Sequence, residues 1–186
     1  MQLKFALSEI QTWYLGYLKE SRPVDLVHEA RIETVTALEV RARGYYTKEE
    51  LVEVCRWKSP RSQSLVAKNP EGFVESVTRT ALSTDDERLR IEVLTLLKGV
   101  SWPTASALLH FGTPNLYPIL DFRAIWSLSI DTAPAYNFDF WWEYTTTCRQ
   151  LAQQAAVSMR SLDRALWQFA RKSQPQKTRL AASIKA

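Results

Sequence analysis

Apolar residues recur along this chain at the three- and four-residue spacing of an α-helix. Alternation with a period of two, which marks a half-buried strand, is almost absent. Helical patterns return after residue 121, at about residues 122–128, 139–157 and 161–171, and turn-forming residues separate them. The first clear helical run consists of Ile10, Trp13, Tyr14, Tyr17 and Leu18. The pattern predicts an all-α fold of about nine or ten helices.

Proline and glycine mark several helix boundaries. Pro23 precedes a helix that runs to about Arg43, and Gly44 is a natural stop for it. The pair Asn69-Pro70 can open another helix further along. We therefore expect a long helix near residues 23–43, followed by shorter ones.

Two capping-box patterns predict further helix starts. Thr47 with Glu50 is the first, and Thr84 with Glu87 is the second. The second is followed by four apolar residues that we expect on one helix face: Leu89, Val93, Leu96 and Leu97.

Length and charge bound the organisation of the chain. With 186 residues, 46% of them hydrophobic, the chain can bury one substantial core. We expect one helical domain over residues 1–173, with two lobes, and a basic tail over residues 174–186. No acidic residue follows Asp163, whereas six cations do: Arg164, Arg171, Lys172, Lys177, Arg179 and Lys185. This end is either a solvated tail or a nucleic-acid contact, and a net charge of +4 permits an anionic partner without requiring one.

Several classes of protein do not fit the sequence. The two cysteines, Cys55 and Cys148, lack the close Cys or His neighbours that zinc or iron–sulfur ligation needs, so we expect no metal site. The first residues form no continuous apolar run, and no run approaches the ~20 apolar residues of a membrane span. We expect a cytoplasmic monomer with reduced thiols and no membrane contact.

A sharp turn is predicted between two short helices, within a hairpin over residues 89–112. Gly99 lies at its centre, and Pro103 stands near the start of the second helix. A helix N-terminus offers free N–H donors and a positive dipole end, which suit a phosphate. Gly99 would let a DNA backbone approach, and Lys98 would add a salt-sensitive charge contact. Such contacts position a protein on DNA without reading its sequence.

This segment resembles the helix-hairpin-helix DNA glycosylase superfamily. The superfamily pattern is Leu-Pro-Gly-Val-Gly, two variable residues and Thr-Ala, ending at a carboxylate near Pro-Ile-Leu-Asp. The matching residues here are Leu97-Lys98-Gly99-Val100-Ser101, Thr104-Ala105 and Tyr117-Pro118-Ile119-Leu120-Asp121. The seventeen-residue step from Thr104 to Asp121 is similar to that of the adenine-mismatch branch.

The resemblance implies a two-lobed glycosylase-like fold with a cleft for double-stranded DNA between the lobes. It also implies that the hairpin carbonyls can hold a monovalent cation, and no organic cofactor is required. The residues that it assigns to the DNA backbone are Lys98, Gly99, Val100, Ser101 and Thr104.

Two departures limit the resemblance. Ser101 replaces the second glycine of the hairpin. Pro103 stands where bifunctional members carry a Schiff-base lysine, and proline has no amine for that intermediate. We therefore expect no lyase activity. The four-cysteine cluster loop of many members is also missing, so packing alone must hold the fold.

Asp121 is the predicted catalytic residue. Cleavage of an N-glycosidic bond builds positive charge on the sugar. A carboxylate can either stabilise this charge or activate the attacking water. The alternative is that Asp121 only caps a helix beginning at Phe122, and the two roles are compatible. Arg123 can hold a phosphate, pair with the carboxylate, or form an ordinary surface salt bridge.

A base must leave the duplex to be cleaved, and aromatic and polar side chains then bind it. Trp57, Lys58 and Arg61 form an aromatic-basic group that suits a base or a phosphate. The alternative is that Trp57 packs in the core, because it shares a helix face with Leu51 and Val54.

Other candidates have weaker patterns. In this fold class the helix with Glu33 and Glu39 commonly borders the base pocket, so either can protonate a leaving base. The favoured interpretation is that both are ordinary carboxylates of the helix surface. Trp141-Trp142 is interpreted as core and lobe-interface packing rather than a recognition platform, and His28 and His110 as structural.

The sequence thus predicts a monofunctional DNA N-glycosylase that removes a flipped, damaged or modified base with water. It would act in base-excision repair or in defence against modified phage DNA. The main alternative is a non-catalytic helix-hairpin-helix DNA-binding protein, and a third is a helical protein-interaction module.

Overall fold

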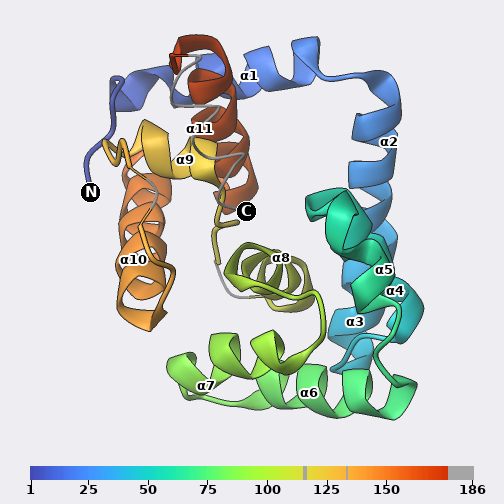
Figure 1. The fold of residues 1–186 in the computed structure, drawn as a ribbon. Coiled ribbons are helices and arrows are strands. Elements are labelled where there is room, and N and C mark those ends of the chain that lie inside the picture. The colour runs from blue at the N-terminus through green and yellow to red at the C-terminus, as the bar shows by residue number, and fades with distance from the viewer. Residues whose placement is uncertain (115–116, 133, 176–186) are drawn as a thin grey trace. The chain divides into compact units, whose positions relative to one another are not determined.

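The computed structural model describes residues 1–114, 117–132 and 134–175. Over these ranges the secondary structure is helical and contains no β-strand, so the predicted all-α class is confirmed (Figure 1). Most of the predicted basic tail, with Lys177, Arg179 and Lys185, lies outside the described residues.

The chain folds into two compact units. The central unit is continuous, Arg22–Ile119, and the terminal unit combines Met1–Ser21 with Leu120–Ala186. Each unit contains its own fully buried apolar side chains, such as Leu51 in the central unit and Trp141 in the terminal unit. The expected single domain over residues 1–173 stays a prediction.

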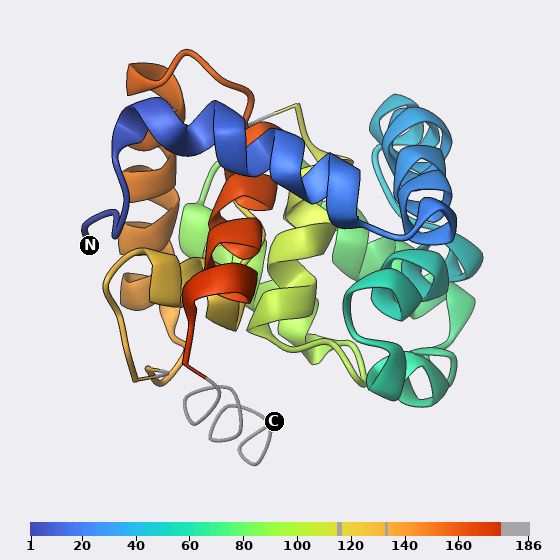
Figure 2. The same ribbon diagram turned by 90° about the horizontal axis from the view of Figure 1, so that it is seen from above.

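The terminal unit is built around its last helix. In Figure 2, α1 crosses α11, and α9 and α10 also pack on α11. The backbone N–H groups of Gln2 and Lys4 donate to the carbonyls of Leu128 and Ser127 at 3.2 and 3.0 Å, which ties the N-terminal segment to the end of α9. The helical segments are η1 (Leu7–Glu9), α1 (Ile10–Glu20), α9 (Phe122–Ser127), α10 (Phe138–Gln154) and α11 (Met159–Ser173).

The central unit starts with the predicted long helix. It runs without a break through α2 (Pro23–Arg31), η2 (Ile32–Thr36) and α3 (Ala37–Arg43), and η2 is a π-helical turn. Gly44 ends it in the left-handed region, with φ +83°, as predicted.

Shorter helices complete the central unit. The helix α8 is largely buried, and it packs against α3, α4, α6 and α7 (Figure 1). The segments are α4 (Lys48–Lys58), η3 (Pro60–Ser62), α5 (Gln63–Val66), α6 (Glu71–Ser83), α7 (Glu87–Glu92), η4 (Val93–Leu96) and α8 (Trp102–Gly112).

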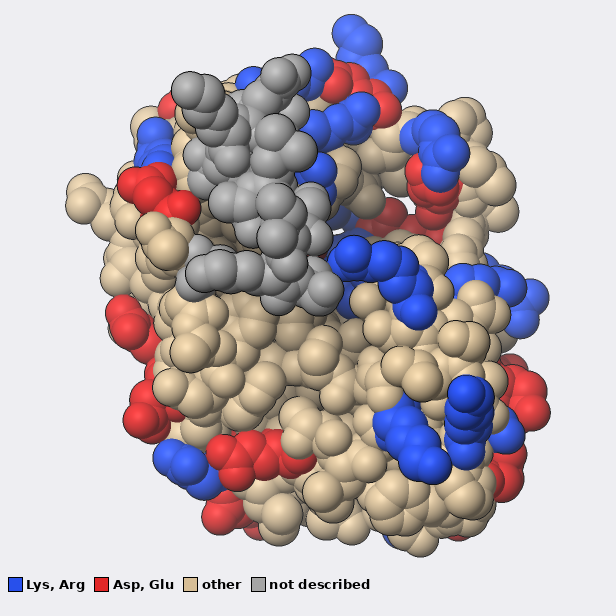
Figure 3. Space-filling model, viewed as in Figure 1, with Lys and Arg blue, Asp and Glu red and all other residues tan. Residues whose placement is uncertain are grey.

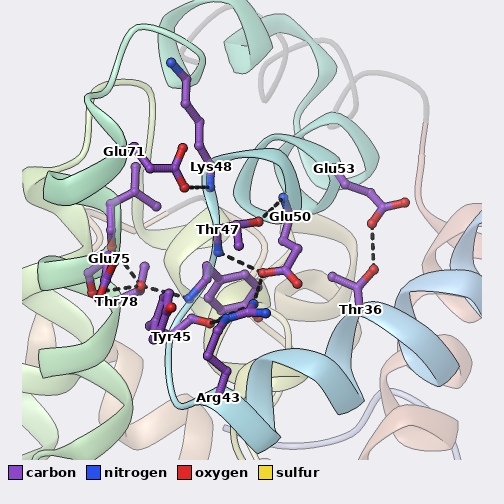
Figure 4. A network of polar contacts seen from close by, with 12 residues as sticks. Thr36, Arg43, Tyr45, Thr47, Lys48, Glu50, Glu53, Glu71, Glu75 and Thr78 are labelled. Atoms are coloured by element: carbon purple, nitrogen blue, oxygen red, sulfur yellow. Dashed lines mark hydrogen bonds and ion pairs between the residues drawn. The ribbon is translucent and has the colours of Figure 1, made fainter.

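A polar network joins α3, α4 and α6 (Figure 4). The Thr47–Glu50 capping box forms as predicted, with the Thr47 N–H 2.8 Å from Glu50 Oε2 and the Glu50 N–H 3.3 Å from Thr47 Oγ1. Glu50 also pairs with Arg43 of α3, and Glu71 of α6 accepts from the Lys48 N–H at 3.1 Å. The start of α4 is therefore fixed from both sides.

Two expectations about the next helix are wrong. The N-cap of α7 is Asp86, whose carboxylate accepts from the N–H groups of Arg88 and Leu89 at 2.8 and 3.0 Å. Thr84 instead follows the end of α6 and accepts from the Asp86 N–H. The aspartate competes successfully because its carboxylate reaches two free N–H groups at once.

The buried face of this helix also differs from the predicted one. Leu89 and Leu96 are 44% and 63% exposed, whereas Ile91, Leu94 and Leu97 are buried. The α-helix ends at Glu92 and continues as the tighter 3-10 turn η4, which changes the angle between successive side chains. One helical period therefore does not predict which side chains between residues 89 and 97 are buried.

Candidate functional site

The predicted sharp turn is present between η4 and α8. The Val100 N–H donates to the Leu97 carbonyl at 3.0 Å, and Gly99 has φ +78°. A left-handed residue in the third position is what a type II turn requires. Ser101 then precedes α8 in an extended conformation, and Pro103 lies in its first turn. The central unit therefore presents the start of α8 directly after a closed turn.

Position 99 requires glycine for two reasons: its positive backbone angle φ, and the close approach of neighbouring residues that leaves no room for a side chain. A Cβ at this position would lie 2.9 Å from Leu65 Cβ and from Val66 Cγ2, and 3.0 Å from the Ser62 carbonyl oxygen. The space that the missing side chain leaves is thus filled by η3 and α5. The expectation that Gly99 lets a DNA backbone approach stays a prediction.

Asn69 fastens the turn from the same side. Its side-chain amide donates to the carbonyls of Lys98 and Val66 at 3.0 and 2.8 Å, and its Oδ1 accepts from the Lys98 N–H at 2.9 Å. Asn69 is 1% exposed. The sequence pattern indicated this residue only as part of a helix start, because its partner lies 29 residues away.

The turn leaves backbone donors unused at the start of α8. The Lys98 N–H is occupied by Asn69, which removes it as a backbone donor for DNA. Within the described parts of the chain, the N–H groups of Gly99, Ser101 and Trp102 have no hydrogen-bond acceptor. Ser101 is exposed. Free N–H donors at the positive end of a helix can bind an anion.

The remaining predicted contacts of the hairpin differ in accessibility. The Lys98 side chain is exposed, whereas Val100 is 7% exposed and Thr104 is fully buried. A DNA backbone outside the turn can therefore meet Lys98 and the free N–H groups. The side chains of Val100 and Thr104 contribute packing.

Trp57 packs on α8. Its ring lies 5.4 Å from that of Phe111, edge to face, and Leu51 and Val54 on the same helix are fully buried. This contact agrees with the core interpretation, and a role in a base pocket stays a prediction. Lys58 is half-buried and Arg61 is exposed in η3, next to the segment that contacts Gly99.

The two glutamates of the long helix lie in different surroundings. Glu33 is half-buried in the π-helical turn η2, and Glu39 is exposed on α3. Glu29, one turn before Glu33, is 1% exposed, and no sequence pattern singled it out. A π-helical turn is unusual and often accompanies a functional site. Glu33 is therefore the better placed of the two predicted candidates.

Asp121 caps α9 in the terminal unit. Its Oδ1 accepts from the Arg123 N–H at 2.9 Å, and its side chain is half-buried. The predicted cap is confirmed, while its catalytic role stays a prediction. The hydrogen bond fixes where the carboxylate points.

Two tyrosines lie in the electrostatic field of Asp121. Burial raises the pKa of the Tyr136 hydroxyl, and the Asp121 charge raises it further. Burial also raises the pKa of Tyr144, with smaller contributions from Cys148, Asp163 and Asp121. Tyr136 is half-buried and Tyr144 fully buried, so Tyr136 is the more accessible neighbour of the carboxylate. No sequence pattern indicated either residue.

Arg123 lies against aromatic rings. Its guanidinium carbon is 4.6 Å from the Phe122 ring centre and 4.9 Å from that of Trp167 on α11. Cation–π contacts of this kind hold the side chain beside the start of α9. The backbone N–H of the same residue contacts Asp121, so Arg123 is a neighbour of the candidate catalytic residue.

The segment before Asp121 is anchored in the central unit. The Tyr117 hydroxyl donates to the Glu87 carboxylate at 2.7 and 2.8 Å, and the Tyr117 carbonyl lies 2.7 Å from His110 Nδ1. Tyr117 is fully buried. His110 has the structural contact that we expected of it.

Basic and acidic side chains are mixed on the face that Figure 3 shows. Lys and Arg side chains lie in separate groups, with Asp and Glu side chains between several of them. In the part of the chain that the structure describes, no helix has the length and apolar character to cross a membrane, and no three His, Cys, Asp or Glu side chains form a metal-binding group.

Comparison with protein-family models, curated proteins and solved structures finds no match to this chain.

Proposed function

We propose that this protein is a monofunctional DNA N-glycosylase. The observation that carries the proposal is the turn at residues 97–101, which has free N–H groups at the start of α8. Further along the chain, Asp121 is the N-cap of α9. The resemblance in these residues also implies a two-lobed glycosylase fold with a DNA cleft, which is part of the proposal.

The turn would hold the enzyme on duplex DNA. Free N–H groups and the helix dipole attract a phosphate oxygen, and the exposed Lys98 adds a charge. These contacts are independent of base sequence, so the enzyme can move along DNA in search of its target. A target base would then be flipped out of the stack.

Asp121 would act on the sugar of the flipped nucleotide. Its Oδ1 accepts from the Arg123 N–H, which fixes where the carboxylate points. The carboxylate would stabilise the sugar cation or activate the attacking water. The C–N bond to the base breaks and the bond from the water oxygen to the anomeric carbon forms. One water proton goes to the leaving base, and the other stays on the new sugar hydroxyl. With Pro103 in place of an amine, the strand stays uncut.

Glu33 is our candidate for the proton donor to the base. It is half-buried in the π-helical turn η2, a local structure that often accompanies a functional site. Glu39 is exposed and better suited to the helix surface.

A second candidate function is sequence-independent DNA binding without catalysis. One observation favours it: the cap hydrogen bond already gives Asp121 a structural task. In that case the turn would bind DNA and no base would be released.

The test is base release from duplexes that each carry one damaged or modified base. Abasic sites are detected by strand cleavage in hot alkali, with an untreated arm to detect lyase activity. We expect cleavage only after alkali, and loss of activity in Asp121→Asn. Asparagine caps a helix about as well as aspartate, so this variant keeps α9 while removing the charge.

Each outcome separates the candidates. Undiminished base release by Asp121→Asn removes Asp121 from the mechanism. Salt-dependent DNA binding with no base released from any duplex supports the non-catalytic candidate. Cleavage without alkali contradicts the monofunctional assignment.

A further inference from the structure

The two chain segments that meet at the turn lack acidic residues. Two segments of the central unit, residues 54–70 and 93–114, contain no Asp or Glu. Together they carry five basic residues, Arg56, Lys58, Arg61, Lys68 and Lys98. Elsewhere in the unit, acidic and basic residues alternate closely, as in Lys48-Glu49-Glu50.

The fold packs these two segments against each other at the turn. Gly99 lies so close to Ser62 and Leu65 that a Cβ would meet them at 3.0 and 2.9 Å. The Asn69 side chain bridges to both backbone polar groups of Lys98. Arg61 precedes Ser62 and Lys68 precedes Asn69 in the chain, so both cations follow the backbone directly next to residues that contact the turn.

These three cations have no partner within the described residues. Arg61, Lys68 and Lys98 are exposed, and their side chains form no ion pair or hydrogen bond there. Two other cations of the same unit differ in this respect, because Arg43 pairs with Glu50 and Arg79 pairs with Glu75 at 2.6 Å. Neighbouring unpaired cations repel one another, and a polyanion relieves that repulsion.

We propose that Arg61, Lys68 and Lys98 form, with the free N–H groups of the turn, one surface that binds several neighbouring phosphates of duplex DNA. We call it the turn surface. Asn69 directly follows Lys68 in the chain, and its side chain is hydrogen-bonded to the Lys98 backbone. It therefore sets the spacing between Lys68 and Lys98. The identity of the partner as DNA rests on the proposed function, whereas the location of the surface rests on charge and packing.

The proposal has a quantitative consequence for the salt dependence of binding. Each phosphate that a cation neutralises releases condensed counterions and adds about 0.9 to the slope of log K against log salt. Removal of all three cations should therefore lower the slope by about 2.7. A change of net charge elsewhere on the protein should leave the slope nearly unchanged.

The test measures binding of unmodified duplex DNA by fluorescence anisotropy over a series of salt concentrations. It compares the full-length protein with the triple variant Arg61→Gln, Lys68→Gln and Lys98→Gln. The control, Arg22→Gln, Lys48→Gln and Arg79→Gln, has the same change of charge in the same unit. Arg22 and Arg79 have carboxylate partners, Asp25 and Glu75, which keep these cations from DNA. Thermal unfolding followed by circular dichroism verifies that both variants are folded.

We expect the slope of the triple variant to fall by about 2.7 and that of the control to stay near wild type. Equal slopes for the two variants overturn the turn surface, and so does wild-type protein that shows no salt-dependent binding. Base release is measured separately. If the slope falls as expected but no base is released, the turn surface stands and the proposed glycosylase activity fails.

Discussion

A matched pair of glycine substitutions tests how the turn is held. Gly99 and Gly44 both have positive φ, +78° and +83°, and both lie in the central unit. A Cβ on Gly99 would meet three atoms at 3.0 Å or less, whereas one on Gly44 would meet nothing within 4 Å. Gly99→Ala and Gly44→Ala therefore share the backbone strain and differ in packing.

The structure sets the expected sizes of the two effects. Left-handed backbone costs an alanine about 1–2 kcal/mol, of which the stiffer unfolded chain offsets about 0.4–1 kcal/mol. Gly44→Ala should thus lower the free energy of unfolding by about 1 kcal/mol. At Gly99, two of the three close atoms, Leu65 Cβ and the Ser62 carbonyl oxygen, are fixed to the backbone and cannot rotate away. Overpacking of this kind adds about 1–3 kcal/mol, so Gly99→Ala should cost about 2–4 kcal/mol.

Urea unfolding followed by far-ultraviolet circular dichroism measures both values. Binding of unmodified duplex DNA to the folded variants gives a second readout. Gly99→Ala should weaken binding, because α5 or the turn must shift to accommodate the methyl group. Gly44→Ala should bind like wild type. Equal losses of stability in the two variants, with equal DNA affinity, would refute the reasoning that packing against α5 sets the turn.

Three further predictions concern single residues. Asn69→Ala removes three hydrogen bonds and leaves the buried partners of its amide unsatisfied, so urea unfolding should show a loss of about 2–4 kcal/mol; a loss below about 0.5 kcal/mol would contradict the role of Asn69. Burial raises the pKa of the Cys55 thiol from 9.0 to about 12, so the unfolded chain releases this proton first and stability should fall as pH rises from about 9 towards 12. Unfolding at pH ~8.5 and ~10 should therefore show a steeper decline for wild type than for Cys55→Ala, and equal declines would contradict this account. Asp121→Ala should destabilise α9 by about 1 kcal/mol relative to Asp121→Asn, measured by thermal unfolding, and no difference would argue against the cap.

The parts of the fold that were predictable from sequence depend on neighbours along the chain. The Pro23 start, the Gly44 stop and the Thr47–Glu50 box are each decided within about one helical turn, so the residues alone indicate them. The same local reasoning failed at Thr84. There two capping residues, Thr84 and Asp86, stand close together, and only the arrangement of the backbone selects between them.

The parts that were missed depend on distant partners. Asn69 reaches Lys98 across 29 residues, and Gly99 is confined by α5 rather than by its own turn alone. Tyr136 lies near Asp121 although the residues between them follow no motif. Sequence reasoning therefore found the turn and the carboxylate, while the residues that hold the turn or surround the carboxylate required the structure.

The measurement closest to the central claim is mass spectrometry of bases released from natural DNAs, including modified phage DNA. Each DNA is incubated with the wild-type protein, with Asp121→Asn, or with buffer alone. The glycosylase account predicts one free base that appears with wild type and is absent from both controls, while the DNA strands stay intact before alkali. Free bases at the same level in all three incubations, from every DNA tested, would contradict it.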